Sequence, residues 1–464
     1  MKQLKYILIL AIFASACSEE FTDLAPISQR NVENFYQTES DVRTGVNAIY
    51  SVLQQDGCYN DSYWTMFEMR SDNTDNVSES GLASVRFTID AFEDEPTNEV
   101  ITNAYTTSYL GVARANIVLS RIGEVNMDAN LKNQYTGEAL FLRSLFYYHL
   151  ALSFGNIPLV LDETKSVDEG LEHRQVPASA VFDQLIADLT QAESLLPVKY
   201  TGANVGRATK GAAAALLGKV LLTVNKKGEA ATVLRRIVSS YGYTLLSDYA
   251  NLWGVENENN AESIFEVQYQ GGLGSEGNRF TNDFSASLPT SVSGYRNRPT
   301  MDLMRAYEPG DLRFAASIDT FYIDNSGRPH SSSTDNSRWT IKYGRTNPFN
   351  EGDAPNNFVV LRYADVLLML AEAIGESAEA YSLINQVRNR AGLGNIDAST
   401  PGTFAQKLLK ERQVELAFEN HRWADLLRFG VAETVMRAHG KNPRLLFYIP
   451  QRELDLNPNF KQNN

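Results

Sequence analysis

Short motifs that could carry chemistry are few in this chain of 464 residues. Residues 272–277 read Gly-Leu-Gly-Ser-Glu-Gly, which fits the G-x-G-x-x-G pattern of dinucleotide sites. Such a site needs a helix that opens directly after the glycines. Residues 278–293 are instead polar, contain Pro289 and have no helical period. We therefore interpret the glycine-rich segment as a loop.

Metal-binding and nucleophile patterns are equally weak. Residues 72–76 read Asp-Asn-Thr-Asp-Asn and resemble the start of a calcium loop, but the Gly and the closing Glu of that loop are missing. The histidines, at positions 149, 173, 330, 421 and 439, lack the spacing of metal ligands. Carboxylate pairs for glycoside hydrolysis stay open, because such pairs can be distant in sequence. The sequence thus predicts no metal, no cofactor and no catalytic residue.

The amino-acid composition limits which kinds of molecule this protein could bind. The formal net charge is −14, which argues against nucleic acid because phosphate binding requires basic surfaces. The apolar share of 43% indicates a globular chain. The aromatic content is high, with 22 Tyr, 22 Phe and 4 Trp. Tyrosine in that number serves a core, or a binding face where one end of the ring stays in water.

The first 17 residues read as an export signal. Lys2 and Lys5 precede an apolar run at 6–13, and small residues at 14–16 lead directly to Cys17. This order resembles a bacterial lipobox, which predicts a signal peptide at 1–16, lipid attachment at Cys17 and a tether at 17–36. The alternative is an ordinary signal peptide cut near Ala16. No later apolar run approaches the roughly 20 residues that a membrane helix needs.

The remaining elements are mostly helices in pairs. Helical periodicity predicts helices at about 40–53, 98–122, 130–154, 179–196, from 209 onward, and at 229–240, 363–374, 377–390 and 403–420. Thr38 or Ser40 can cap the first of these helices, and Ser179 can cap the fourth. Paired helices of this length favour a tetratricopeptide-like solenoid. Residues 256–361 differ, since they hold a strand pattern at 264–269 and long polar loops.

Several blocks carry a resemblance to a known family. They are LRYADVLLMLAEA at 361–373, VRNRAGL at 387–393, ERQVELAFENHRWADL at 411–426 and IPQRELDLNPN at 449–459. In the N-terminal half, EALFLRSLFYY at 138–148, GNIPLV at 155–160 and RATKGA at 207–212 agree too. Together they resemble the SusD/RagB family of nutrient-binding outer-membrane lipoproteins. Asn420 departs from the family pattern, which usually has Gly there.

The resemblance implies a mostly α-helical fold of tetratricopeptide-like pairs, with an irregular, loop-rich insert that carries a few short strands. It divides the chain into an N-terminal helical region at 37–255 and a C-terminal region at 256–464. The latter contains the insert at 256–361 and closing helices at 362–430.

The resemblance also implies a binding protein rather than an enzyme, anchored by lipid on the outer face of the outer membrane. It would capture a polysaccharide or oligosaccharide and act as the lid of a SusC-like TonB-dependent β-barrel transporter. The alternatives are the same lid role for oligopeptides, or a surface glycoside hydrolase.

A glycan site should pair exposed aromatic rings with polar side chains, because sugar rings have apolar faces and polar edges. Two stretches qualify, at 59–73 and in the insert at 295–298 with 338–340. The candidate ligand-binding residues are Trp64, Tyr63, Tyr295 and Trp339, and each of them could equally be a core residue. We expect Trp423 and Trp253 to be core aromatics, and Glu411, Arg412, Glu415 and Arg422 to form ion pairs.

Overall fold

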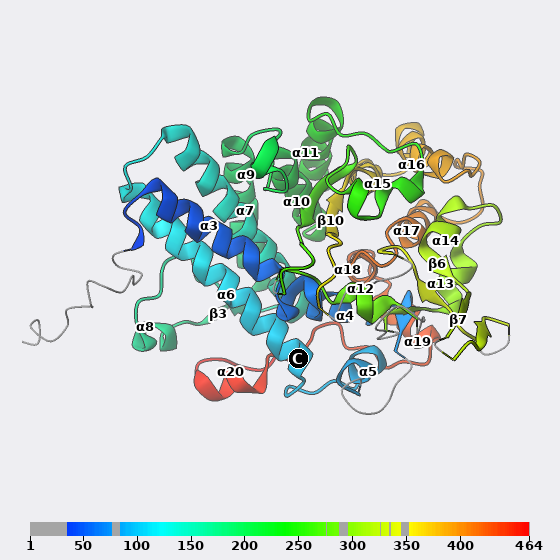
Figure 1. Cartoon of the computed structure of the whole chain (residues 1–464), viewed down its shortest axis with the longest axis horizontal. Helices are drawn as coiled ribbons and strands as arrows, with labels where there is room; N and C mark the ends of the chain where they lie inside the picture. Colours follow the sequence, from blue (N-terminus) through cyan, green and yellow to red (C-terminus); the bar gives the residue numbers. More distant parts are fainter. Residues whose placement is uncertain are drawn as a thin grey trace, which may run out of the picture.

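The fold is described from a computed structural model of the chain (Figure 1). The structure describes residues 35–76, 84–274, 276–286, 296–324, 326–333, 336–344 and 352–463. The predicted signal peptide at 1–16, the lipid site at Cys17 and most of the tether at 17–36 lie outside these residues. Among the helices described, none has the length and apolar character needed to span a bilayer.

The long helices pack on one another in the order in which they occur along the chain, from α3 to α11, and α15 continues the stack against α11. They are α3 (Glu39–Leu53), α6 (Glu99–Arg121), α7 (Ala129–Phe154), α9 (Ala178–Leu195), α10 (Lys210–Thr223), α11 (Lys227–Ser240), α15 (Tyr363–Ile374), α16 (Ala378–Arg390) and α17 (Phe404–Glu415). This arrangement confirms the predicted mostly α-helical, tetratricopeptide-like fold. The domain boundaries at 36/37 and 255/256 stay predictions.

Short helices and two-stranded sheets fill the rest. The helices are α4 (Ser62–Phe67), α5 (Ser84–Ala91), α8 (Val167–Leu171), α12 (Phe280–Phe284), α13 (Met301–Ala306), α14 (Leu312–Ser317), α18 (Arg422–Arg428), α19 (Ala432–Ala438) and α20 (Gln451–Leu456). The strands are β1 (Thr74–Asp75), β2 (Ile157–Pro158), β3 (Gln175–Val176), β4 (Ser263–Val267), β5 (Arg298–Pro299), β6 (Ile318–Asp319), β7 (Phe321–Ile323), β8 (Pro329–Ser331), β9 (Trp339–Thr340) and β10 (Phe358–Arg362). They pair antiparallel as β1–β5, β2–β3, β4–β10, β6–β9 and β7–β8. In Figure 1, β10 runs between the N-terminal helices on the left and the C-terminal elements on the right.

Small residues let neighbouring helices approach closely. A methyl group placed on Gly111 of α6 would lie 2.3 Å from the Phe146 ring on α7. A methyl group on Gly218 of α10 would lie 2.5 Å from Leu234 on α11. Both distances are shorter than van der Waals contact, so the glycines set the spacing of these helix pairs.

Two predicted helix boundaries were wrong. Ser179 lies inside α9, which begins after Pro177, and proline suits a helix start because it has no N–H to leave unbonded. The helix predicted at 403–420 ends at Glu415, and Phe418 and Asn420 then adopt positive φ angles. The Glu415 carbonyl instead accepts from the Arg362 guanidinium at 2.6 Å, a contact from residues far away in sequence.

Buried ion pairs join the insert to the helical body. Arg362 at the end of β10 contacts Glu262, Glu415 and Glu419, and all four side chains are at most 1% exposed. The predicted ion pairs are confirmed as buried ones, since Arg313 contacts Glu411 and Glu415, Arg412 contacts Asp365 and Asp425, and Arg422 contacts Asp72. Such charges tolerate burial because each is paired and hydrogen-bonded. Trp423 and Trp253 are buried, as predicted.

Candidate ligand-binding site

Two of the stretches singled out in the sequence lie side by side in the structure. β1 pairs with β5, which sets Asp75 opposite Arg298. Just beyond the pair, Thr300 donates its N–H to the Asn73 carbonyl at 2.8 Å and its hydroxyl to the Asp72 carbonyl at 2.6 Å. Figure 1 shows α4 and α12 close to each other near the centre of the molecule. Residues more than 200 positions apart thus form one face.

Arginine–aspartate pairs cover this face. We call its four arginines, Arg86, Arg279, Arg296 and Arg298, the arginine cluster. Arg86 contacts both carboxylate oxygens of Asp61, at 3.1 and 2.5 Å. Arg298 contacts both oxygens of Asp75, at 2.7 and 2.9 Å. Bidentate pairing fixes each guanidinium in one orientation. The side chains of Arg279, Arg296 and Arg298 are 25, 18 and 16% exposed, so part of each remains open to solvent.

Asp283 connects two members of the cluster. Its carboxylate lies 2.5 Å from Arg296 and 3.3 Å from Arg279. Burial raises the pKa of Asp283 above its ordinary value, while the charges of Arg296 and Arg279 act in the opposite direction. Asp61 and Arg86 also act on this carboxyl group, which places the pairs within electrostatic reach of one another. Arg296 and Arg279 are thus joined through one carboxylate, while Arg86 with Asp61 and Arg298 with Asp75 form separate bidentate pairs.

The predicted stacking residues of α4 are buried. Trp64 is 0% exposed, packs edge-on against Phe284 of α12 at 5.0 Å, and lies 5.7 Å below the Arg86 guanidinium. Tyr63 is 1% exposed and its hydroxyl is 2.8 Å from that of Ser108. Burial counts against the prediction that these rings stack on a ligand, because neither ring presents a face to solvent. Trp64 supports Arg86 from inside, whereas Tyr63 packs in the main core.

Of the other two predicted residues, one is buried and one lies outside the described residues. Trp339 is 1% exposed and packs with Ala286 and Tyr322 in a small separate core. Its burial counts against a stacking role as well. Tyr295 lies outside the described residues, as does Cys17, and their roles stay predictions. Sequence reasoning could not separate core tryptophans from exposed ones, because their partners come from distant segments.

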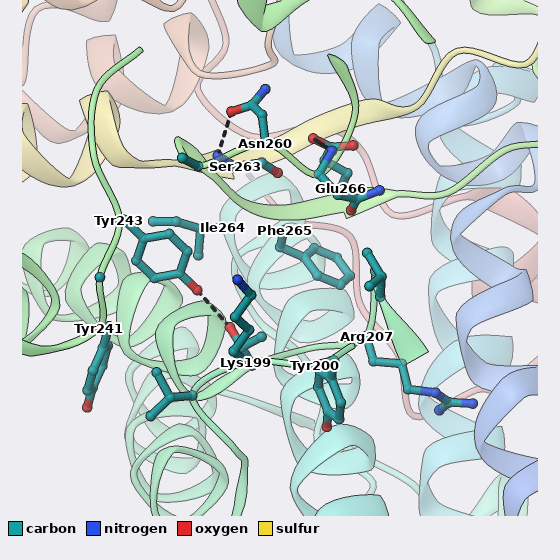
Figure 2. A pocket seen from close by; sticks show the side chains of 17 residues that line it. Lys199, Tyr200, Arg207, Tyr241, Tyr243, Asn260, Ser263, Ile264, Phe265 and Glu266 are labelled. Carbon is teal, nitrogen blue, oxygen red and sulfur yellow. Dashed lines mark hydrogen bonds between the residues drawn. The ribbon is translucent and has the colours of Figure 1, made fainter. Parts of the chain in front are cut away.

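A hollow elsewhere in the fold was missed by the sequence analysis. It lies between the α9–α10 connection, the end of α11 and β4, and has a volume of about 330 Å³ (Figure 2). Tyr200, Tyr241 and Tyr243 line it together with Phe265, and we call it the tyrosine pocket. A signal was present, since each of these tyrosines follows a helix end near Pro or Gly. Their convergence, however, depends on the fold.

The motifs that resembled cofactor or metal sites have other partners. Gly272 and Gly274 adopt positive φ angles in a turn, and the Asp353 carboxylate accepts the Gly272 N–H at 2.8 Å. The Asp72 carboxylate pairs with Arg422 rather than lying open for a cation. Across the described parts of the chain, no three His, Cys, Asp or Glu side chains are arranged to hold a metal ion.

This helical-repeat scaffold with its loop-bearing insert matches known families. Residues 320–446 match the family described as "SusD family", and residues 20–222 match the one described as "Starch-binding associating with outer membrane". The chain belongs to the SusD family.

Individual relatives are similar over nearly the whole chain. A solved structure of a "Laminarin binding SusD-like protein" is 30% identical, with a TM-score of 0.81, covering 92% of this chain and 99% of that one. "SusD-like protein P2" of Formosa agariphila is 27% identical over 98% of both chains. "Surface glycan-binding protein A" from Bacteroides fluxus shares the fold, with a TM-score of 0.80 at 24% identity over 92% of this chain and 99% of its own.

Proposed function

We propose that this protein binds a glycan at the cell surface and is a binding protein rather than an enzyme. The observation that carries the proposal is the 30% identity, over nearly the full length of both chains, to a protein named for laminarin binding. The description of the family matched at 20–222 also names starch binding and the outer membrane. Both descriptions concern recognition of a polysaccharide, and neither names a reaction.

The arginine cluster is the surface that we assign to the glycan. Sugar hydroxyl groups both donate and accept hydrogen bonds. An Arg–Asp pair offers donors on the guanidinium and acceptors on the carboxylate within one rigid unit. Arg298 with Asp75 is such a unit, and its two side chains are 16 and 26% exposed. Arg296, which pairs with the buried Asp283, adds a second partly exposed guanidinium as a donor. Because their geometry is already fixed by pairing, a bound sugar would impose little further loss of side-chain entropy.

The proposal also covers how the protein is anchored to the membrane and where it delivers the glycan. Cys17 would carry the lipid that holds the protein on the outer face of the outer membrane. The captured glycan would pass to a SusC-like TonB-dependent transporter for which this protein is the lid. Palmitate labelling of the wild type and Cys17→Ser tests the anchor. Co-purification of a large β-barrel from detergent extracts tests the partner, and repeated isolation of this protein alone would count against it.

Affinity electrophoresis tests the glycan proposal. Purified protein is run through gels that contain laminarin, starch or xylan. We expect retardation by at least one polysaccharide, and at least a tenfold loss in the Arg296→Ala/Arg298→Ala variant. The matched control is Arg235→Ala/Arg437→Ala, which removes two arginines whose side chains are 49 and 58% exposed elsewhere.

Three outcomes would contradict the glycan proposal or its assigned surface. Absence of retardation by every polysaccharide, together with binding of oligopeptides, would favour the peptide-lid alternative. New reducing ends in a glycan incubated with the protein would favour the hydrolase alternative. Equal losses in the cluster variant and the control would remove the assignment to the arginine cluster.

A further inference from the structure

We propose that the tyrosine pocket is a second saccharide-binding site, separate from the arginine cluster. This inference rests on the proposed glycan-binding function and adds a site to it. The pocket shares no lining residue with the arginine cluster, since it is built from the α9–α10 connection, the residues after α11 and the first part of β4. Its volume of about 330 Å³ falls at the lower end of the range for small-molecule sites.

Three tyrosine rings are held in place around the hollow by their own hydroxyl groups. The Tyr200 hydroxyl donates to Glu138 of α7 at 3.2 Å, and the Tyr241 hydroxyl donates to Glu193 of α9 at 2.6 Å. The Tyr243 hydroxyl lies 2.9 Å from that of Thr209, the capping residue of α10.

Each tyrosine hydroxyl is thus hydrogen-bonded to a different helix or helix cap, while the three rings remain half-exposed. Fixed aromatic rings can stack on the apolar face of a sugar without first losing rotamer freedom.

The backbone of the pocket is also constrained. Gly206 has a φ angle of 93°, and a methyl group on it would lie 2.6 Å from the Gln268 side chain. Gly242, between two of the tyrosines, has a φ angle of 78°. Both angles lie in the left-handed region that favours glycine. Another residue at either position would be strained. The two glycines therefore fix the shape of the connection that carries Tyr200 and of the turn that carries Tyr241 and Tyr243.

One cation of the pocket has no charged partner among the described residues. Arg207 is neutralised by Glu138 at 2.7 Å, and the buried Glu266 accepts hydrogen bonds from Asn259 and Asn357. Lys199 is exposed, and Figure 2 shows its side chain pointing into the hollow between Tyr243 and Phe265. Its ammonium group can donate to sugar hydroxyls or to a sugar carboxylate. Fixed aromatic rings and a free donor are among the groups that a saccharide needs.

Filling the pocket provides the test, because truncating a tyrosine could disturb the fold. Val205 lines the pocket and is 46% exposed. Val255 is also 46% exposed but does not line it. Val205→Trp should therefore block the pocket, and Val255→Trp is the matched control. The probes are laminarihexaose, maltohexaose and a trigalacturonate, titrated calorimetrically into the full mature chain.

We expect two sites per wild-type chain for at least one probe. Val205→Trp should weaken one site at least tenfold, Val255→Trp should leave both unchanged, and Arg296→Ala/Arg298→Ala should weaken the other. A single site that is equally strong in Val205→Trp and Val255→Trp would overturn the second site and leave the proposed function standing. Absence of binding by the wild type to every saccharide, polysaccharides included, would overturn both.

Discussion

Arg422 forms a bidentate ion pair with Asp72, which lies 350 residues earlier in the chain, and both N–O distances are 2.7 Å. The two side chains are 6 and 7% exposed. Burial alone would raise the pKa of Asp72, but the Arg422 charge and its hydrogen bonds, together with a backbone hydrogen bond, outweigh burial and hold that pKa below its ordinary value. The pair fixes the first residue of α18 to the segment that leads into β1. The candidate glycan face is therefore tied directly to the C-terminal helices.

Removal of this pair should destabilise the protein strongly. Arg422→Ala leaves the Asp72 carboxylate buried without its partner, which typically costs about 3–5 kcal/mol. Urea unfolding followed by circular dichroism measures the change. The control is Arg437→Ala, whose partner Glu433 is 3.8 Å away and whose side chain is 58% exposed, so a loss below about 1 kcal/mol is expected. Comparable losses in the two variants would contradict the assigned role of the buried pair.

Glycine at the α6–α7 contact should be irreplaceable. Gly111→Ala places a methyl group 2.3 Å from Phe146, and overpacking of this kind costs about 1–3 kcal/mol. Gly228→Ala is the control, because it lies in the first turn of α11 with no other atom within 4 Å. That change should stabilise the helix by up to about 1 kcal/mol. Thermal unfolding separates the two, and a stabilised Gly111→Ala variant would disprove the close contact.

Local sequence signals were sufficient for most of the fold. Thr38 caps α3 with a full capping box, and the apolar stripe of that helix is buried as its spacing predicts. The end of α17 could not be found in this way. The Glu415, Ala417 and Phe418 carbonyls accept hydrogen bonds from Arg362, Lys342 and Tyr343, which are distant in sequence. These contacts replace the helical pattern that the local sequence favours.

Polar and aromatic composition pointed to residues 59–73, which lead into β1, and to residues 295–298, which reach β5. That these stretches bind a ligand stays a prediction. Whether Trp64 faces solvent depends on Phe284, which comes from α12 and packs against it. The tyrosine pocket was missed for a related reason, because Tyr200 and Tyr243 lie in separate connections that meet only in the folded chain.

Buried histidines should make the protein sensitive to acid. Burial, with the charge of Lys219 adding to it, lowers the pKa of His149 to about 3, and the pKa of His421 also falls to about 3. In the unfolded chain a histidine titrates near about 6.5. The unfolded chain therefore binds more protons between these pH values, and the free energy of unfolding falls as pH drops from about 6.5 toward 3.

Each such histidine contributes a slope of up to about 1.4 kcal/mol per pH unit in that window. His149→Gln should remove one of these slopes. The measurement is urea unfolding at half-unit steps between pH 4.5 and 6. An identical pH dependence in the variant and the wild type would show that His149 is already protonated in the folded protein.

Glu68 should give a pH dependence of opposite sign. Burial raises its pKa to about 8, whereas the unfolded carboxyl group titrates near about 4.3. A raised folded pKa contributes stability that is present below the unfolded value and is lost as pH rises through the folded value. Glu68→Gln should therefore gain stability relative to the wild type as pH rises from 5 to 8. A constant difference in the free energy of unfolding between the two proteins across this range would show that the pKa of Glu68 is not raised in the folded protein.

Trp339 should affect stability and not ligand binding. Its ring is 1% exposed and packs with Ala286 and Tyr322, so Trp339→Ala should lose about 3–5 kcal/mol by leaving a cavity. Trp339→Phe fills more of the space and should lose less. The informative comparison is affinity electrophoresis of Trp339→Phe on the polysaccharide that retards the wild type. Unchanged retardation with lower stability is expected, because the ring lies in the core. Lost retardation with unchanged stability would return Trp339 to the ligand site and show that the small core around it opens when the glycan binds.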